Sequence, residues 1–297
     1  MTAELFNYLL IHRRLAAALL ALALTTACRS DCHPPHSQLP RMDPDPFQEI
    51  RPPVKYKERS LRVFKAGTGP PVIILHEITG LSPETFRLGR MVAQAGFSVY
   101  LPLLFGEPGD SRFFANGLRA CAGAWFHCFD KTQTNDPQLI ETLVILSQRV
   151  SNENGSVSVG VIGMCMTANT GLELVREDSP VQAVVASQPA LPFFKPCALG
   201  VSADTLGRVR DARIPVLALR FTGDPKSPQE RLLRLQDEIG DRFMAYEIDS
   251  GPLNSFGIRR HAHAVLTAEL VDEPSHPTRL AFDKVIQLFK DELHKRP

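Results

Sequence analysis

The chain has 297 residues, of which 44% are hydrophobic and 22% are charged, and its formal net charge is +1. Such a chain can bury one large core or two small ones. Because it has neither a basic face nor an acidic tail, nucleic acid is not an expected partner. The six cysteines lack the paired spacing of zinc sites and are too few for a disulfide scaffold. Buried free thiols are therefore favoured over a disulfide or a metal-binding pair.

Residues 1–53 are predicted to lie outside the fold. Arg13 and Arg14 precede an apolar run over residues 15–24, and small residues follow before Cys28, which is the pattern of an export signal. The run is too short to span a membrane. Two alternatives stay open. The protein is exported, or lipid-anchored through Cys28, or else it is cytoplasmic with a true start near Met42, which makes residues 1–41 an over-extended start.

Residues 54–297 are predicted to form one α/β domain, because no linker-like break interrupts them. Strands are expected at 61–66, 71–75, 97–101, 157–162, 181–186, 215–221 and 243–248. Helices are expected at 82–94, 136–150, 168–175, 228–239 and 277–293. Strands that alternate with helices, several of them continuous apolar runs, are typical of a mostly parallel sheet with helices on both faces.

The segment 157–168 has the form of a nucleophile elbow. A buried strand is followed by Gly163, one further residue, Cys165 and a helix. The start of a helix favours the thiolate, so Cys165 is a candidate nucleophile for acyl transfer. A buried, unreactive thiol is the alternative. Thr167 is larger than the neighbours that such a turn prefers.

Two further candidates follow later strands, and in a parallel sheet such positions meet at the carboxyl edge. Asp224 comes after strand 215–221 and is either a simple turn residue or the acid that orients a catalytic histidine. His261 and His263 follow the last strand, so the order nucleophile, acid, histidine is that of α/β-hydrolases. We favour His263 because the apolar run 264–266 follows it directly. The two histidines could also bind a metal as a pair, but no carboxylate lies near them in sequence, so no metal is predicted.

Residues 76–80 follow strand 71–75 and form a turn of the kind that supplies an oxyanion hole. The backbone amides of Ile78 and Met166 are the two predicted donors. Glu77 lies in the same turn and is either a surface residue at a strand end or part of the site.

Together these motifs resemble the dienelactone hydrolase family, a cysteine-nucleophile branch of the α/β-hydrolases, over residues of about 60–295. The resemblance implies an α/β-hydrolase fold and a triad of Cys165, Asp224 and His263. It also implies that Glu77 switches the cysteine between thiol and thiolate. Two departures stand out. Thr167 and Ala168 replace the usual glycines, and the arginines that grip a substrate carboxylate have only unmatched candidates: Arg112, Arg119, Arg259 and Arg260.

The predicted function is hydrolysis of a small ester, lactone or thioester through an acyl-cysteine intermediate, without a cofactor and without a stable membrane span. One alternative is a non-catalytic α/β-hydrolase scaffold that binds a ligand or a partner. Another is a thiol redox protein, which would need a resolving cysteine that the sequence near Cys165 lacks. The sequence specifies neither the natural substrate nor the oligomeric state.

Overall fold

The computed structural model describes residues 46–109, 111, 116, 120, 126, 135–155 and 157–293, which fall in one compact unit. The predicted export signal with Cys28, the alternative start at Met42, and the arginine candidates Arg112 and Arg119 lie outside the described residues.

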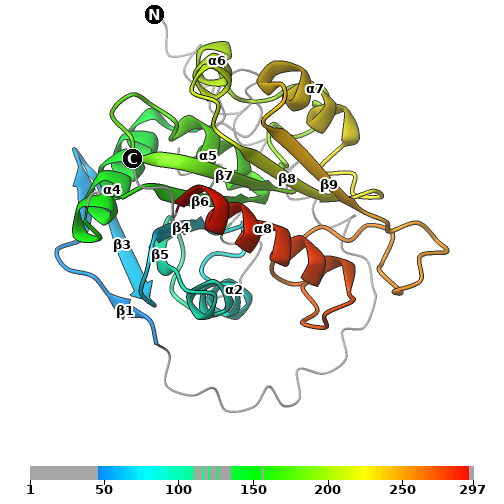
Figure 1. Ribbon diagram of the computed structural model, residues 1–297, viewed down its shortest axis with the longest axis horizontal. Helices are drawn as coiled ribbons and strands as arrows, with labels where there is room; N and C mark the ends of the chain where they lie inside the picture. The colour runs from blue at the N-terminus through cyan, green and yellow to red at the C-terminus, as the bar shows by residue number, and fades with distance from the viewer. Residues whose placement is uncertain are drawn as a thin grey trace, which may run out of the picture. The chain divides into compact units, whose positions relative to one another are not determined.

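Nine strands in the described residues form a single sheet with the order β1-β3-β5-β4-β6-β7-β8-β9, and β2 pairs with β3 (Figure 1). Strands β1 and β2 each pair antiparallel with β3, and β3 pairs antiparallel with β5. All pairs among β4 to β9 are parallel. The mostly parallel α/β architecture predicted from the sequence is therefore confirmed. The strands are β1 (Gln48–Glu49), β2 (Val54–Tyr56), β3 (Arg59–Ala66), β4 (Pro71–Leu75), β5 (Ser98–Leu103), β6 (Val159–Met164), β7 (Val181–Ser187), β8 (Val216–Phe221) and β9 (Phe243–Ile248).

Helices cover both faces of this sheet (Figure 1). One core contains β4 residues Ile73 and Leu75 and apolar side chains from α4, α5, α6 and α7. The other contains the alternate β4 residues Val72 and Ile74 and side chains from α2 and α8. A strand whose successive side chains both meet helices must be apolar throughout, which explains the continuous runs. The helices are α2 (Pro83–Gln94), α4 (Pro137–Glu153), α5 (Ala168–Glu173), α6 (Ala203–Asp211), α7 (Gln229–Ile239) and α8 (Pro277–Leu293).

Helix starts follow the expected capping chemistry. The Ser82 hydroxyl accepts a hydrogen bond from the Thr85 amide at 3.3 Å at the start of α2, and Asp136 accepts from the Leu139 amide at 3.1 Å at the start of α4. In each helix proline occupies the first turn, where its missing N–H costs nothing.

The structure differs from the expected elements at several places. Strand β1 lies within residues 1–53, so the folded part begins before residue 54; two polar residues in a proline-rich stretch carry no strand signal. Helix α6 was not expected, because only Thr205, Leu206 and Val209 of its residues are buried. Strand β6 runs two residues further than predicted, since Gly163 and Met164 continue the ladder with β7, and it therefore leads directly into Cys165.

Candidate active site

Cys165 sits on a tight turn at the carboxyl end of β6. It begins a short 3₁₀-helix, Cys165–Thr167, that continues into α5, and its backbone φ is +58°. This left-handed conformation is strained for a residue with a side chain and persists only where surrounding structure enforces it. A Cβ on Gly163 would lie 2.3 Å from the Thr167 carbonyl oxygen, so only glycine fits there. The predicted elbow geometry is present, and the thiol is free and 7% exposed.

Thr167, which departs from the elbow pattern, ties the turn to the neighbouring strand. Its hydroxyl accepts a hydrogen bond from the Met164 amide at 2.9 Å and lies within donating distance of the carbonyl oxygens of Leu75, at 3.0 Å, and Met164, at 2.9 Å. A glycine could not make these contacts. The threonine therefore joins the elbow to the end of β4, where the turn 76–80 begins.

Asp224 and His263 are in direct contact although they come from different loops. The His263 Nδ1 lies 2.6 Å from Asp224 Oδ2, and Asp224 Oδ1 accepts a hydrogen bond from the Lys226 amide at 3.0 Å. The Asp224 side chain is fully buried and that of His263 is 15% exposed. Because the carboxylate accepts from Nδ1, the Nε2 atom faces away from Asp224. His261, the other candidate, is exposed.

His263 is placed to carry a positive charge. Burial lowers its pKa, but the negative charge of Cys165 and the hydrogen bond to Asp224 outweigh burial and raise the pKa to about 10. Within the described part of the chain, the buried Nε2 atom has no hydrogen-bond partner. The imidazole is therefore held at Nδ1, and its Nε2 remains available for proton transfer.

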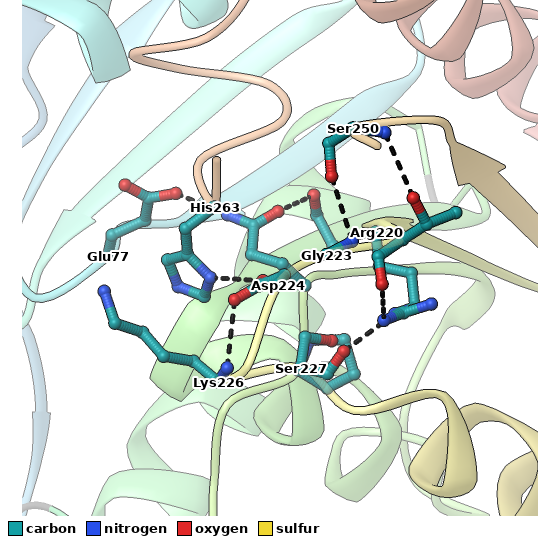
Figure 2. Close-up of polar contacts among 12 residues, drawn as sticks. Glu77, Arg220, Gly223, Asp224, Lys226, Ser227, Ser250 and His263 are labelled. Atoms are coloured by element: carbon teal, nitrogen blue, oxygen red, sulfur yellow. Dashed lines mark hydrogen bonds and ion pairs between the residues drawn. The ribbon is translucent and has the colours of Figure 1, made fainter. Parts of the chain in front are cut away.

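The loops that carry Asp224 and His263 are joined at their bases. The Ser250 hydroxyl accepts from the Gly223 amide at 2.9 Å and donates to the Arg260 carbonyl at 3.2 Å, and the Ser250 amide donates to the Thr222 hydroxyl at 3.0 Å (Figure 2). A Cβ on Gly223 would lie 2.1 Å from the Arg260 carbonyl oxygen. The backbones touch here, which fixes the separation of the acid and the histidine.

Glu77 lies on the other side of His263. Figure 2 shows the His263 ring between Glu77 and Asp224, with the Lys226 side chain extending toward the Glu77 side. Glu77 is only 5% exposed, so it is not a surface residue, and its Oε1 accepts a hydrogen bond from Gln188 Nε2 at 2.6 Å. Burial raises the Glu77 pKa, whereas the charge of His263 lowers it. The protonation of Glu77 is therefore coupled to that of His263.

His76 holds the turn that carries Glu77. Its Nε2 accepts a hydrogen bond from the Leu104 amide at 3.0 Å, which leaves Nδ1 to donate to the Glu77 carbonyl at 2.8 Å. Burial lowers the His76 pKa to about 4. A neutral, fully bonded imidazole is a structural group rather than an acid or a base.

The predicted oxyanion donors occupy equivalent positions on neighbouring loops. In the register of β4 and β6, Leu75 is aligned with Gly163, and Ile78 and Met166 each come three residues later. Both loops leave the same edge of the sheet.

Three buried residues that sequence reasoning missed also shape the site. Gln188 directly follows β7, so the same strand-end rule would have found it. Arg220, inside β8, donates to the Ser227 carbonyl at 2.7 Å and to the Thr222 carbonyl at 3.0 Å, and so holds the Asp224 loop (Figure 2). Nothing in a sequence marks an arginine with such partners, because they come from the tertiary structure.

Arg231 of α7 is the third, and it binds two loops at once. Burial lowers its pKa to about 10, and the charge of Asp224 acts in the opposite direction. Its guanidinium donates to five carbonyl oxygens, those of Pro189, Pro192, Lys195, Ala198 and Lys226, at 2.6–3.4 Å. A guanidinium has five N–H donors in a rigid plane, so it can satisfy all five acceptors together.

The two arginine candidates within the described residues, Arg259 and Arg260, have their side chains at the surface. Arg259 pairs with Glu269 at the surface, and Arg260 is exposed and contributes its carbonyl group rather than its side chain. In the described ranges, no group of three or more metal-ligating side chains could hold a metal ion. Among the helices of the described residues, none combines the length and apolar character needed to cross a membrane.

Comparisons with known proteins agree with the fold described above. The family model described as the dienelactone hydrolase family matches residues 61–293. A search of curated proteins finds no match.

Solved structures with the same fold include a dienelactone hydrolase from Anabaena variabilis, with 15% identity, a TM-score of 0.57, and coverage of 84% of this chain and 100% of that chain. An esterase from Pyrococcus furiosus has 14% identity and a TM-score of 0.57, covering 83% and 93% of the two chains. A dienelactone hydrolase-like promiscuous phosphotriesterase from metagenomic libraries has 17% identity and a TM-score of 0.55, covering 82% and 97%. At these identities the structures establish the fold.

Proposed function

Because the chain belongs to the dienelactone hydrolase family and is a hydrolase of that type, we propose that it cleaves a small carboxylic ester, lactone or thioester through an acyl-cysteine intermediate. The observation that carries the proposal is the position of His263. Its Nδ1 lies 2.6 Å from Asp224 Oδ2, and the charge of Cys165 acts on the same ring. These two observations support a triad in which Cys165 is the nucleophile, His263 the base and Asp224 the acid that orients it.

The reaction begins with attack of the Cys165 thiolate on the carbonyl carbon. The carbonyl oxygen becomes an oxyanion, which accepts hydrogen bonds from the amides of Ile78 and Met166; one such donor typically contributes about 10²–10³ in rate. When the intermediate collapses, the carbon–oxygen or carbon–sulfur bond to the leaving group breaks. The leaving group takes the proton from His263 Nε2, and the acyl-cysteine remains.

Water then releases the acyl group. Neutral His263 removes a proton from the attacking water, which forms a second tetrahedral intermediate on the carbonyl carbon. Collapse breaks the carbon–sulfur bond, frees the acid product and restores the Cys165 thiolate beside the His263 imidazolium. Throughout, Asp224 keeps the proton of His263 on Nδ1 and stabilises the ring when it is charged.

Glu77 is proposed as the switch that controls the thiolate. An ionised Glu77 places a second negative charge near His263, which stabilises the imidazolium and with it the Cys165 thiolate. A protonated Glu77 withdraws that support. The coupling between the Glu77 pKa and the charge of His263 supports this role.

The test uses the purified full chain with p-nitrophenyl esters, thioesters and unsaturated lactones. Cys165→Ala is expected to reduce turnover to the background rate, and mass spectrometry of the wild-type protein at early times should detect the acyl group on Cys165. Cys197→Ala is the matched control, because Cys197 is the other free cysteine of the described residues and is exposed. Full activity of Cys165→Ala would refute the proposal.

A non-catalytic scaffold is the alternative with the same fold. A protein without catalytic activity does not need a contact between the acid and the histidine, nor a buried thiol on a strained turn. Asp224 and His263 are nevertheless in contact, and Cys165 has a left-handed backbone. These features support a catalytic role over a scaffold.

A further inference from the structure

A row of three buried polar side chains ends at Glu77. The Ser187 hydroxyl donates to Gln188 Oε1, and Gln188 Nε2 donates to Glu77 Oε1 at 2.6 Å. Ser187 and Gln188 are fully buried and Glu77 is 5% exposed. Buried polar groups must find partners within the protein, so the three side chains depend on one another.

The backbone holds Gln188 in one place. Its φ is +36°, a left-handed conformation that is unfavourable for glutamine, and its amide donates to the Leu219 carbonyl at 2.6 Å. Two residues later, the Ala190 amide donates to the Cys165 carbonyl at 3.1 Å. The segment that contains Gln188 is thus hydrogen-bonded to the turn that carries Cys165. Strain of this kind, when the surrounding structure enforces it, is a reason to seek a functional role.

We propose that Gln188 is a positioning residue that holds Glu77 beside His263 and satisfies the Glu77 side chain in both of its protonation states. The proposal rests on the role suggested above for Glu77. As a carboxylate, Glu77 accepts from Gln188 Nε2, the arrangement observed. As a carboxylic acid, it donates to Gln188 Oε1 after a half-turn of the amide, and the Ser187 hydroxyl then accepts from Nε2.

Glutamine is suited to this exchange because its amide has a donor and an acceptor, and the serine hydroxyl can act as either. A methionine could serve neither form of Glu77. A lysine or arginine would favour only the carboxylate, and a second carboxyl group would favour only the acid. A partner with both functions allows Glu77 to gain or lose a proton without leaving a buried polar atom unsatisfied.

The other groups around Glu77 shift its pKa in opposite directions. His263, on the loop after β9, and Lys226, on the loop after β8, favour the carboxylate through their positive charges. Burial and the charge of Glu84, on α2, favour the acid, while the hydroxyl of Thr267 favours the carboxylate. Because these influences oppose one another, the hydrogen bond from Gln188 can decide the ionisation of Glu77.

The test measures the ionisation of Glu77 directly. The full chain is labelled with glutamate carrying ¹³C at its side-chain carboxyl, and the Glu77 resonance is assigned by its loss in Glu77→Gln. Gln188→Met removes the donor to the carboxylate and leaves the side-chain volume nearly unchanged. The Glu77 pKa should therefore rise by about 1–2 pH units. The acid limb of the pH profile of kcat/KM should move upward by the same amount, since only ionised Glu77 supports the imidazolium.

Two further variants complete the experiment. Gln188→Glu puts a second carboxyl group in the place of the amide that contacts Glu77, at nearly unchanged volume, so the two groups should share one proton and titrate higher than in Gln188→Met. This variant carries the test if Gln188→Met does not fold. Gln148→Met is the matched control, because Gln148 lies on α4 and its side chain bonds the Asp178 carbonyl at the surface; its profile should equal that of the wild type.

An unchanged Glu77 titration in both Gln188 variants would overturn the proposal, and so would a uniform loss of activity with an unmoved pH profile. The carboxyl titration does not depend on turnover. If Cys165→Ala kept full activity while the Glu77 titration moved as expected, the acyl-cysteine mechanism would fail and the positioning role of Gln188 would stand.

Discussion

Glu77 is a buried acid whose ionised form opposes folding. Its carboxylate accepts a hydrogen bond from Gln188, yet burial still raises its pKa above the usual value. A raised pKa means that the folded state binds the proton more tightly than the unfolded chain does. The stability of the fold therefore decreases as the pH rises from the unfolded pKa through the folded pKa, where a carboxylate must be buried.

Glu77→Gln should for this reason raise the melting temperature at pH 7, by roughly 2–4 °C for each kcal/mol recovered. The gain should shrink as the pH falls below the folded pKa, because the wild-type side chain is then neutral as well. Thermal unfolding from pH 4 to pH 8 measures both effects. A gain that does not depend on pH would contradict the explanation, and kcat/KM should fall in the same variant, as expected for a residue that trades stability for function.

The sequence predicted the polar side chains that follow strands. Cys165, Glu77, Asp224 and His263 are polar residues that come after apolar runs, and the structure brings Glu77, Asp224 and His263 to one edge of the sheet together with the elbow of Cys165. The choice of His263 over His261 agrees with the contact to Asp224. Gln188 obeys the same rule and was missed because an amide does not suggest chemistry by its type.

The elbow and the end of β4 act as one element through Thr167. In Thr167→Val the shape is kept, but the Met164 amide and the Leu75 carbonyl lose their buried partner. We expect a loss of stability of about 1–3 kcal/mol, since each buried polar group left unsatisfied bears its full desolvation cost. Urea unfolding measures this loss, and kcat/KM should fall because the turns carrying Ile78 and Met166 are no longer joined.

Thr142→Val provides the control for this variant. The Thr142 hydroxyl bonds the Gln138 carbonyl at 2.6 Å within α4, and that carbonyl is already part of a helix. The control should therefore lose less stability than Thr167→Val and keep its activity. Equal losses in the two variants would mean that the threonine has no special role in the elbow.

Strands and helices were predictable where apolar residues form a long run or a regular pattern, and not where the element is short or buries few side chains. The strands around Cys165 and Asp224 are continuous apolar runs, and they were found with ends displaced by at most two residues. Strand β1 has two residues, and α6 buries only three side chains, so neither has a pattern of its own. Contacts with residues that are distant in the sequence fix the positions of these two elements.

Arg231 connects regions of the molecule that lie far apart in the sequence. It joins α7 to the segment 189–198 after β7 and to Lys226 after β8, through five carbonyl groups. In Arg231→Lys the ammonium has only three donors and no planar fork, so at least two buried carbonyls lose their partner. We expect a loss of stability of about 2–4 kcal/mol and faster hydrogen exchange over residues 189–198.

The matched control lies on the same helix. Arg234 is exposed and pairs with Glu238 at 3.7 Å, so Arg234→Lys should change stability by no more than about 0.5 kcal/mol. Chemical unfolding of the two variants measures the difference. A lysine at position 231 that matched the wild type would show that the five hydrogen bonds are dispensable.

The loop that ends at His263 has consequences for how this molecule could be altered. Its base is tied by Ser250 and Arg260, while Leu253 at its tip is 96% exposed. Asn254 closes the tip on itself through the Gly251 and Ile258 carbonyls. The tip is shaped in part by its own hydrogen bonds, and the exposed Leu253 offers a place to open or extend the polypeptide, for a foreign peptide, a dye or new chain ends, about ten residues from the imidazole.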